Sequence, residues 1–301
     1  MAQHPHSVNQ RGRRLVAGIP LVWLILLFLL PFLIVLKLSF SQERLAIPPY
    51  APFLEWINGL PHPALHLSNY AFLFTDPLYI SAYLYSLKVA AVSTLFCLLL
   101  GYPMAYAIAH APHSRRGMLL MLIVLPFRTS FLLRVYAWIG LLKHDGVINN
   151  ILMSLGVIHE PLTMLQTDFA VYVGIVYSYL PFMILPLYAN LEKHDGALLE
   201  AAADLGARPF MAFLRVTLPQ SVPGIIAGSL LVFIPAVGEY VVPSLLGRTD
   251  QLMIGRVLSD EFFENRDWPL ASAVAILMLL LLVIPIMLFQ RSGGRQIGSH
   301  P

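Results

Sequence analysis

The sequence predicts an all-α protein that crosses a membrane six times, and three observations carry this prediction. Hydrophobic residues make up 58% of the 301 residues and charged residues only 12%, whereas a soluble domain has about 25% charged residues. The hydrophobic residues fall in six long runs, and about 20 apolar residues in a helix cross the hydrocarbon core of a bilayer. The third observation is the uneven distribution of Lys and Arg between the two sets of loops that connect these runs.

The six predicted spans cover approximately residues 16–40, 79–109, 117–141, 169–191, 222–246 and 269–290. The first run follows three arginines, as in a signal peptide, but it is too long for one and no small-residue cleavage site follows it. Prolines fall inside every one of these spans, among them Pro31, Pro103, Pro126, Pro181, Pro186, Pro235 and Pro285. Because a packed membrane helix tolerates proline, we expect kinks rather than breaks.

The loops predict that both termini are cytoplasmic. In that orientation the inner segments contain ten cations: Arg11, Arg13, Arg14, Arg115, Arg116, Lys193, Arg208, Arg215, Arg291 and Arg295. The outer loops contain five: Arg44, Lys143, Arg248, Arg256 and Arg266. This excess follows the positive-inside rule. The outer loops are also rich in Asp and Glu, which would favour cationic solutes; ordinary solvated loops are an equal alternative.

A single membrane domain, 16–290, is predicted between a cytoplasmic N-terminal tail, 1–15, and a cytoplasmic C-terminal tail, 291–301. The outer stretch 41–78 is rich in proline, which predicts a cap made of turns and a short helix that could support a partner. No internal repeat and no long linker divides the chain.

Several function classes are disfavoured. The net charge of +3 is small and the basic residues are scattered, so no nucleic-acid partner is expected. A single cysteine, Cys97, permits no intrachain disulfide and no cysteine cage for a metal. His62 with His66, and His4 with His6, have the spacing of metal ligands but lack further ligands nearby, so no metal site is predicted. No H-E-x-x-H or G-x-S-x-G motif is present, and no catalytic residue is assigned.

The segment between the fourth and fifth predicted spans, 193–221, is predicted to form two short helices. Ala197–Leu205 is rich in good helix formers, and Gly206 suits a left-handed stop. Pro209 fits the first turn of a second helix that Pro219 would close. That helix would carry an exposed ridge of Phe210, Phe213, Leu214 and Thr217.

This segment allows two interpretations. In the first it docks in a groove of a partner, where small alanines permit close approach and Glu200, Asp204, Arg208 and Arg215 fix the register by ion pairing. In the second it is an interfacial helix that lies on lipid headgroups. Residue spacing alone favours neither.

A resemblance favours docking. The segment matches the EAA loop, E-A-A-x3-G-x9-I-x-L-P, of permease subunits of binding-protein-dependent ABC importers, with Val216 in place of Ile. The resemblance implies the type I importer permease fold and makes this loop the coupling helix that enters a cleft of the cytoplasmic ATPase. The coupling residues predicted on this basis are Glu200, Ala201, Ala202, Gly206, Phe210, Phe213, Leu218 and Pro219.

The resemblance extends over nearly the whole chain and is strongest for the polyamine uptake permeases. It includes "NYAFLF", "TSFLLRVYAWIGLLK", "FIPAVGEYVVPSLLG" and "NRDWPLASA". It implies a multi-pass protein of the bacterial inner membrane that imports putrescine, with spermidine or another small solute as the alternative. The implied partners are a related second permease, two copies of the ATPase and an external polyamine-binding protein. Since the chain has no G-x4-G-K-[ST] loop, ATP and Mg are expected on the ATPase and no cofactor on this chain.

Charged residues inside the predicted spans are candidate functional groups, because charge in hydrocarbon is costly. Arg134 lies 16 residues after Met118, and Glu239 lies 16 residues after Pro223. At about 1.5 Å per residue both are about 24 Å from the cytoplasmic side. They could form a structural ion pair between the third and fifth spans. Alternatively, Glu239 lines the outer half of the substrate path and contacts an amine.

Aromatic residues near these charges could complete an ammonium site. Tyr240 follows Glu239, and Tyr136, Trp138 and Tyr179 could add aromatic faces, the usual chemistry for ammonium. They could equally be interfacial anchors. A secondary transporter would contain both halves of its path and several acids for ion coupling. This chain shows no internal repeat and one acid within a span, Glu239. The importer permease is therefore the favoured interpretation.

Overall fold

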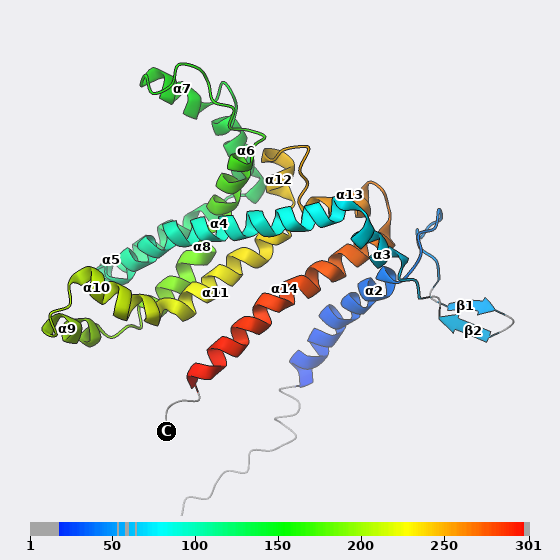
Figure 1. The fold of residues 1–301 in the computed structure, drawn as a ribbon, viewed down its shortest axis with the longest axis horizontal. Helices are drawn as coiled ribbons and strands as arrows, with labels where there is room; N and C mark the ends of the chain where they lie inside the picture. The colour runs from blue at the N-terminus through cyan, green and yellow to red at the C-terminus, as the bar shows by residue number, and fades with distance from the viewer. Residues whose placement is uncertain (1–17, 53, 58–59, 64, 298–301) are drawn as a thin grey trace, which may run out of the picture. The chain divides into compact units, whose positions relative to one another are not determined.

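The structure of the chain is a computed structural model that describes residues 18–297 except 53, 58, 59 and 64. It is mainly helical, as predicted. The chain divides into two compact units (Figure 1): one contains Asp260–Leu277 and the residues up to Thr75, the other Asp76–Ser259 and the residues from Met278 onward. The predicted N-terminal tail, 1–15, lies outside the described residues.

The first unit begins with an apolar helix, Gly18–Ser39, which contains a π-helical turn, η1 (Ile25–Leu29), followed by α2 (Leu30–Ser39). A short helix, α3 (Ser68–Thr75), follows the cap segment. The Asn69 side-chain amide donates to the backbone oxygens of Ser39 (3.1 Å) and Ser41 (2.9 Å), so it joins α3 to the end of α2. The unit also contains the first part of α14 (Trp268–Ile297).

The cap contains a β-hairpin that the sequence analysis did not predict. Strands β1 (Leu54–Ile57) and β2 (Leu60–Pro63) pair antiparallel, with Ile57 opposite Leu60. The signal was present in the sequence, because Asn58-Gly59 is a dipeptide typical of two-residue hairpin turns. The expectation of turns and a short helix alone was therefore wrong.

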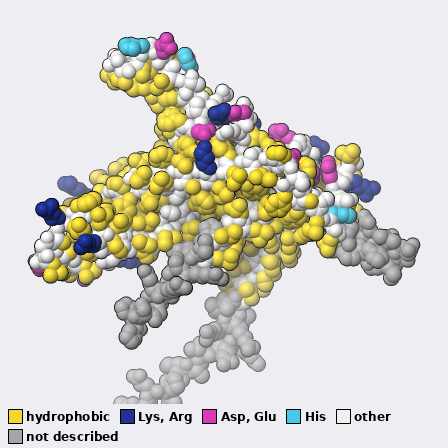
Figure 2. Space-filling view, viewed as in Figure 1, with side chains coloured by type: hydrophobic (Ala, Val, Ile, Leu, Met, Phe, Trp, Pro, Cys, Tyr) yellow, Lys and Arg dark blue, Asp and Glu magenta, His cyan; other side chains and the backbone are white. Residues whose placement is uncertain are grey.

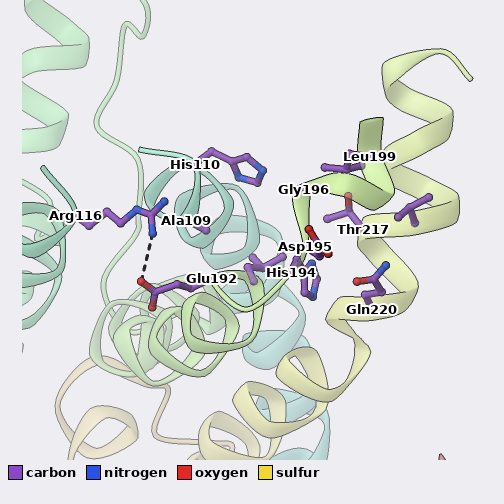
Figure 3. A pocket seen from close by; sticks show the side chains of 12 residues that line it. Ala109, His110, Arg116, Glu192, His194, Asp195, Gly196, Leu199, Thr217 and Gln220 are labelled. Atoms are coloured by element: carbon purple, nitrogen blue, oxygen red, sulfur yellow. Dashed lines mark hydrogen bonds and ion pairs between the residues drawn. The ribbon is translucent and has the colours of Figure 1, made fainter. Parts of the chain in front are cut away.

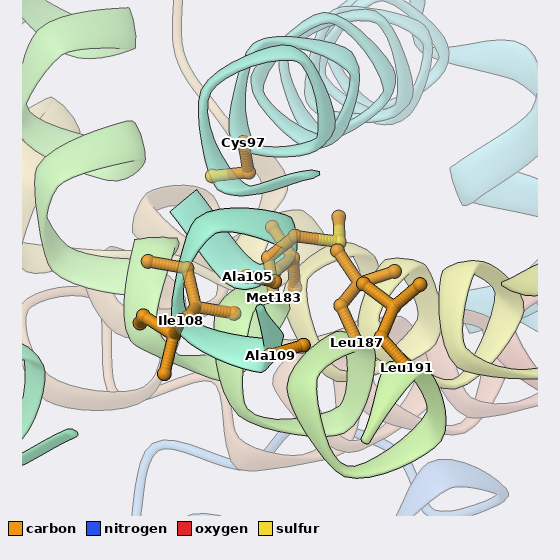
Figure 4. Packing of buried hydrophobic residues seen from close by; sticks show 9 residues of the cluster. Cys97, Ala105, Ile108, Ala109, Met183, Leu187 and Leu191 are labelled. Atoms are coloured by element: carbon orange, nitrogen blue, oxygen red, sulfur yellow. The ribbon is translucent and has the colours of Figure 1, made fainter. Parts of the chain in front are cut away.

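The second unit contains the following elements: α4 (Pro77–Ala109), α5 (His113–Val124), η2 (Leu125–Arg128), α6 (Phe131–Leu142), α7 (Val147–Ser154), α8 (Asp168–Leu191), α9 (Gly196–Asp204), α10 (Pro209–Ala212), η3 (Phe213–Thr217), α11 (Leu218–Val237), α12 (Val241–Leu246) and the beginning of α13 (Ile254–Phe263). Helices α4, α8 and α11 pack against one another (Figure 1). Figure 4 shows one buried cluster of this packing, in which Cys97 and Ala105 of α4 lie near Met183 and Leu187 of α8.

Two small residues let α11 approach α8 closely. A Cβ atom on Gly228 would lie 2.8 Å from the Met183 sulfur and 3.0 Å from the Met183 backbone oxygen. A Cβ atom on Gly224 would lie 2.7 Å from Cβ of Asn190. This glycine pair at i and i+4 is the small-residue contact by which membrane helices gain dispersion energy, since lipid is as apolar as their side chains.

Two predicted spans are broken, so the expectation of kinks without breaks was wrong for them. The third bends by 88° between His113–Arg128 and Phe131–Ser154, where η2 carries Pro126 and Thr129 turns to an extended conformation. The fifth ends at Val237, and α12 begins only at Val241. In contrast, Pro103, Pro181 and Pro186 lie inside continuous helices.

By length and composition, four helices of the described part could each cross a membrane: Gly18–Ser39, Pro77–Ala109, Asp168–Leu191 and Pro209–Val237. The bent third span would be a fifth. The sixth predicted span lies in α14, whose described apolar stretch, Trp268–Ile284, is shorter. In Figure 2, hydrophobic side chains cover the visible face of the second unit between α7 and the end formed by α9 and α10, where Lys and Arg gather.

Candidate functional site

The segment 193–221 contains two helices with a turn at Gly206 between them, as predicted from its sequence. We call this segment the elbow. Asp195 caps α9 by accepting the N–H of Ala197 (3.0 Å). At the other end the N–H of Gly206 donates to the oxygen of Ala203 (2.8 Å) and that of Ala207 to the oxygen of Ala202 (3.0 Å). This is the Schellman pattern, which needs a left-handed residue, and Gly206 has φ +80°. The predicted glycine stop is confirmed.

The second half of the segment differs from the prediction. Pro209 begins α10, as expected, but Pro219 does not end the helix, which continues through η3 and α11 to Val237. The π-helical turn Phe213–Thr217 directly precedes Pro219. Such a turn accommodates a proline that has no N–H to donate and whose ring clashes with the preceding turn. The second half of the segment 193–221 is therefore continuous with the predicted fifth span.

The predicted aromatic ridge faces two directions. Phe210 is 71% exposed, whereas Phe213 packs edge-on against the rings of Tyr102 (5.7 Å between centroids) and Tyr106 (5.9 Å) of α4. Thr217 is also buried. Phe210 is therefore left free for a partner, while Phe213 fastens the segment to its own bundle.

The remaining predicted coupling residues differ in exposure. Glu200, Ala201, Gly206 and Pro219 are exposed, and Ala202 and Leu218 are half-buried. A hollow of about 510 Å³ lies inside the elbow, lined among others by Ala202, Gly206 and Arg215. The four charged residues expected to fix the register, Glu200, Asp204, Arg208 and Arg215, are exposed, and the ion pairs recorded among the described residues involve none of them.

A pocket of about 300 Å³ separates the elbow from the ends of α4 and α8 (Figure 3). At its rim Arg116 pairs with Glu192 (3.3 Å) and donates through Nε to the backbone oxygen of Ala111 (2.9 Å). Two polar atoms of its lining, Nε2 of His194 and Oγ1 of Thr217, are buried without a hydrogen-bond partner. Buried polar atoms of this kind are ordinarily satisfied by ordered water.

The carboxylate of Glu239 lies at the break in the fifth span and is 7% exposed. Its Oε1 accepts the N–H groups of Val241 (3.1 Å) and Val242 (3.3 Å), so it caps the start of α12. Its Oε2 accepts the phenolic hydrogen of Tyr179 of α8. Three donors therefore offset the cost of burying this charge.

Arg134 does not pair with Glu239. Its guanidinium carbon lies 5.0 Å from the ring centroid of Phe127 and 5.7 Å from that of Phe131. Its Nε and Nη1 atoms are buried and have no hydrogen-bond partner among the described residues. The ion pair considered from the sequence is therefore absent, and each charge is stabilised differently: Glu239 by donors and Arg134 by aromatic faces.

The predicted aromatic partners are not gathered around Glu239. Tyr136 is 56% and Tyr240 44% exposed, and Trp138 packs edge-on against Tyr177 (5.5 Å). Trp138 lines an apolar hollow of about 660 Å³ together with residues of α4 and α8, none of them charged. The aromatic residue that reaches Glu239 is Tyr179.

Sequence reasoning did not find two further rings of this region, Phe127 and Phe182. They pack edge-on at 5.4 Å, and Phe182 lies 6.1 Å from Tyr179. The spacing of Tyr179 and Phe182, three residues apart on one helix, is a signal that would have placed both on one face. Phe127 follows Pro126 in the broken third span, and no periodic pattern in the sequence predicts that its ring lies near Phe182.

Comparisons with known proteins show which family the chain resembles. A family model described as "Binding-protein-dependent transport system inner membrane component" matches residues 13–296. The chain is 40% identical over 285 residues to a spermidine/putrescine transport system permease protein, PotB, of Haemophilus influenzae, covering 95% of each chain. It is 40% identical over 270 residues to PotB of Escherichia coli, covering 90% of this chain and 94% of that one.

Similarity to solved structures concerns the fold. The crystal structure of a bacterial ABC transporter for the import of alginate contains a chain that superimposes with a TM-score of 0.70 at 18% identity. The match covers 96% of this chain and 98% of that chain. The two chains therefore share one fold over nearly their whole lengths.

Proposed function

The chain belongs to the family of binding-protein-dependent transport system inner membrane components, and from this premise we propose that it is a permease subunit of an ATP-driven importer of polyamines. As a permease of this family it is a transport subunit and not an enzyme. Putrescine is the proposed cargo, with spermidine as the alternative within the same importer role.

One observation carries the choice of a polyamine as the cargo. The relatives that are 40% identical over at least 90% of this chain are permeases named for both spermidine and putrescine. The chemistry of the described residues is compatible with a dicationic amine. Glu239, a buried carboxylate at the break in the fifth span, accepts a hydrogen bond from Tyr179, an aromatic residue of α8. Carboxylates and aromatic faces are the groups that bind ammonium.

We further propose that the elbow couples this permease to an ATPase. The residues proposed to contact the ATPase are Glu200, Ala201, Ala202, Gly206, Phe210, Leu218 and Pro219. In support, Phe210 and Leu205 are 71% and 89% exposed, which is costly for large apolar groups unless a partner or a membrane surface covers them. Phe213 is proposed to act indirectly, because its ring holds the segment against α4.

The proposed assembly contains two related permeases, two ATPase copies and one external polyamine-binding protein. A single chain supplies one wall of a path, and the ATPase is a separate subunit in this proposal because the sequence has no phosphate-binding glycine loop. The substrate path is proposed to run past Glu239, Tyr240, Arg134 and Tyr136. Trp138 is a weaker member of this set, because it lines a separate apolar hollow.

The test is substrate-stimulated ATP hydrolysis and import by the complex reconstituted in liposomes. The complex would be supplied with binding protein and with putrescine, spermidine or amino acids in turn. The proposal expects stimulation and uptake with putrescine or spermidine and none with amino acids. Stimulation by amino acids alone would overturn the proposed cargo, and normal transport by this permease without a second permease would overturn the proposed assembly.

A further inference from the structure

A row of aromatic rings connects Glu239 and Arg134, two charged residues that do not pair. From the Glu239 carboxylate the row passes through Tyr179, which donates to it, then Phe182 at 6.1 Å and Phe127 at 5.4 Å between ring centroids. It ends at Arg134, whose guanidinium carbon lies 5.0 Å from the Phe127 centroid. A carboxylate thus occupies one end of the row and a cation the other.

The row is built from segments far apart in the sequence. Tyr179 and Phe182 belong to α8, Phe127 to η2 and Arg134 to α6, and α12, which Glu239 caps, packs against both α6 and α8. Phe182 is 40% exposed, so the rest of the chain does not cover the middle of the row. The rings therefore form an accessible surface between the charges.

We propose that this aromatic row is the ammonium-binding surface of the cargo path and that Phe182 determines its selectivity for amines. The inference rests on the proposed function. One ammonium group of the cargo binds beside Glu239, and the next part of the chain lies over the Phe182 ring, which attracts ammonium through its electron-rich face and packs against methylene groups.

Arg134 sets the far end of this surface. A cation within about 6 Å of an aromatic centroid is attracted to it, so Arg134 already occupies the face that Phe127 offers. No carboxylate neutralises Arg134 among the described residues, and its charge repels an ammonium group that advances along the row. The row thus holds one ammonium near Glu239 firmly and a second one only weakly, which permits release.

The experiment compares import per assembled complex, at saturating loaded binding protein, for Phe182→Leu and Phe182→Tyr. Leucine keeps the bulk and loses the aromatic face, whereas tyrosine keeps the face. The matched control is Phe169→Leu, which removes a phenyl ring that is 53% exposed on the same helix but outside the row. Putrescine and spermidine are the probes, and basal ATP hydrolysis and complex yield are measured in parallel.

The inference expects Phe182→Leu to lower the import rate about tenfold. A tenfold change corresponds to the free energy of about one desolvated cation–π contact. It also expects the putrescine-to-spermidine ratio to change, while basal ATP hydrolysis and yield stay normal. Phe182→Tyr and Phe169→Leu should import like the wild type. Equal loss in Phe182→Leu and Phe182→Tyr would show that shape rather than the aromatic face matters, and would overturn the inference.

The two proposals fail in different ways. If the wild-type complex imports amines but Phe182→Leu behaves like Phe169→Leu, the aromatic row is wrong and the proposed function stands. If Phe182→Leu only lowers complex yield and each assembled complex imports normally, the ring is structural and the inference is again wrong. If the wild-type complex imports neither amine, the proposed function and the inference fall together.

Discussion

Tyr179 of α8 donates its phenolic hydrogen to Glu239, which lies 60 residues later in the break between α11 and α12. The other carboxylate oxygen accepts the N–H groups of Val241 and Val242. One buried carboxylate therefore both starts α12 and joins it to α8. To bind an amine as well, the carboxylate must interact with an ammonium group while it keeps these hydrogen bonds. Its structural role depends on the hydrogen bonds and its proposed transport role on the charge, so the two can be tested separately.

Glu239→Gln tests the charge while keeping the cap. Glutamine has a side-chain oxygen that can still accept the N–H of Val241, but it carries no charge for an ammonium group. We expect near-normal complex yield and import per assembled complex reduced about tenfold, since a hydrogen bond to a charged group contributes roughly 1.5–3 kcal/mol. Glu239→Asp should retain more activity than Glu239→Gln. Near-normal import by Glu239→Gln would contradict the path role.

Glu239→Ala serves as the structural comparison. It removes the cap of α12 and the acceptor of Tyr179 together. Loss of a helix cap costs about 1 kcal/mol, so the melting temperature of the purified complex should fall. Glutamine removes only the charge, whereas alanine removes the charge and the hydrogen-bond acceptors. If both variants lower the melting temperature equally, the charge stabilises the fold and the hydrogen bonds of the cap add nothing.

Gly206→Ala tests the elbow through its backbone. Gly206 has φ +80°, and nothing lies within 4 Å of the position that a Cβ atom would take, so alanine meets no clash but is strained by roughly 1–2 kcal/mol. We expect the membrane part to assemble while ATP-driven import falls. Gly156→Ala is a matched control, because Gly156 has φ +69° and equal space but lies outside the elbow. Equal losses in both variants would refute a specific coupling role.

Phe210 and Phe213 should give opposite results when replaced by alanine. Phe210 is 71% exposed, so Phe210→Ala should leave the melting temperature unchanged and reduce co-purification of the ATPase. Phe213 packs against Tyr102 and Tyr106, so Phe213→Ala should lower stability by a few kcal/mol, as about 3–5 kcal/mol is typical for a fully buried ring. Undiminished ATPase binding by Phe210→Ala would argue for a lipid-facing segment instead.

Asp267 should make the stability of the first unit depend on pH. Burial raises the pKa of its carboxyl above the ordinary value, nearby Glu43 and Glu261 add to this, and the N–H of Leu270, donating at 2.9 Å, opposes it. The folded state therefore binds the proton more tightly than the unfolded state does. The resulting stability is complete below the unfolded pKa, about 3.9, and is lost as pH rises through the folded pKa.

Asp267→Asn should remove this dependence, because asparagine cannot ionise and its side-chain oxygen can still accept the N–H of Leu270. We expect melting temperatures measured from about pH 3.5 upward to decline less in the variant than in the wild type. Parallel curves for the two proteins would mean that Asp267 has the same proton affinity in the folded and unfolded states.

The sequence by itself determined where the long apolar helices lie and where the elbow bends. Long apolar runs specify spans because hydropathy is a property of each segment, and the stop at Gly206 follows from local chemistry, since few other residues adopt a left-handed conformation without strain. The EAA match fixed the family for the same reason: it consists of seven residues within one short segment, Glu200–Pro219.

Only the tertiary structure decided where spans break and what the buried charges contact. The break after Val237 is stabilised by Tyr179, a donor from another helix, and no local pattern contains that information. The ridge beginning at Phe210 was divided in the same way, because α4 supplies ring partners for Phe213, whereas Phe210 is 71% exposed. Equal depth in two spans allowed Arg134 to pair with Glu239, but depth does not fix the direction in which a side chain points.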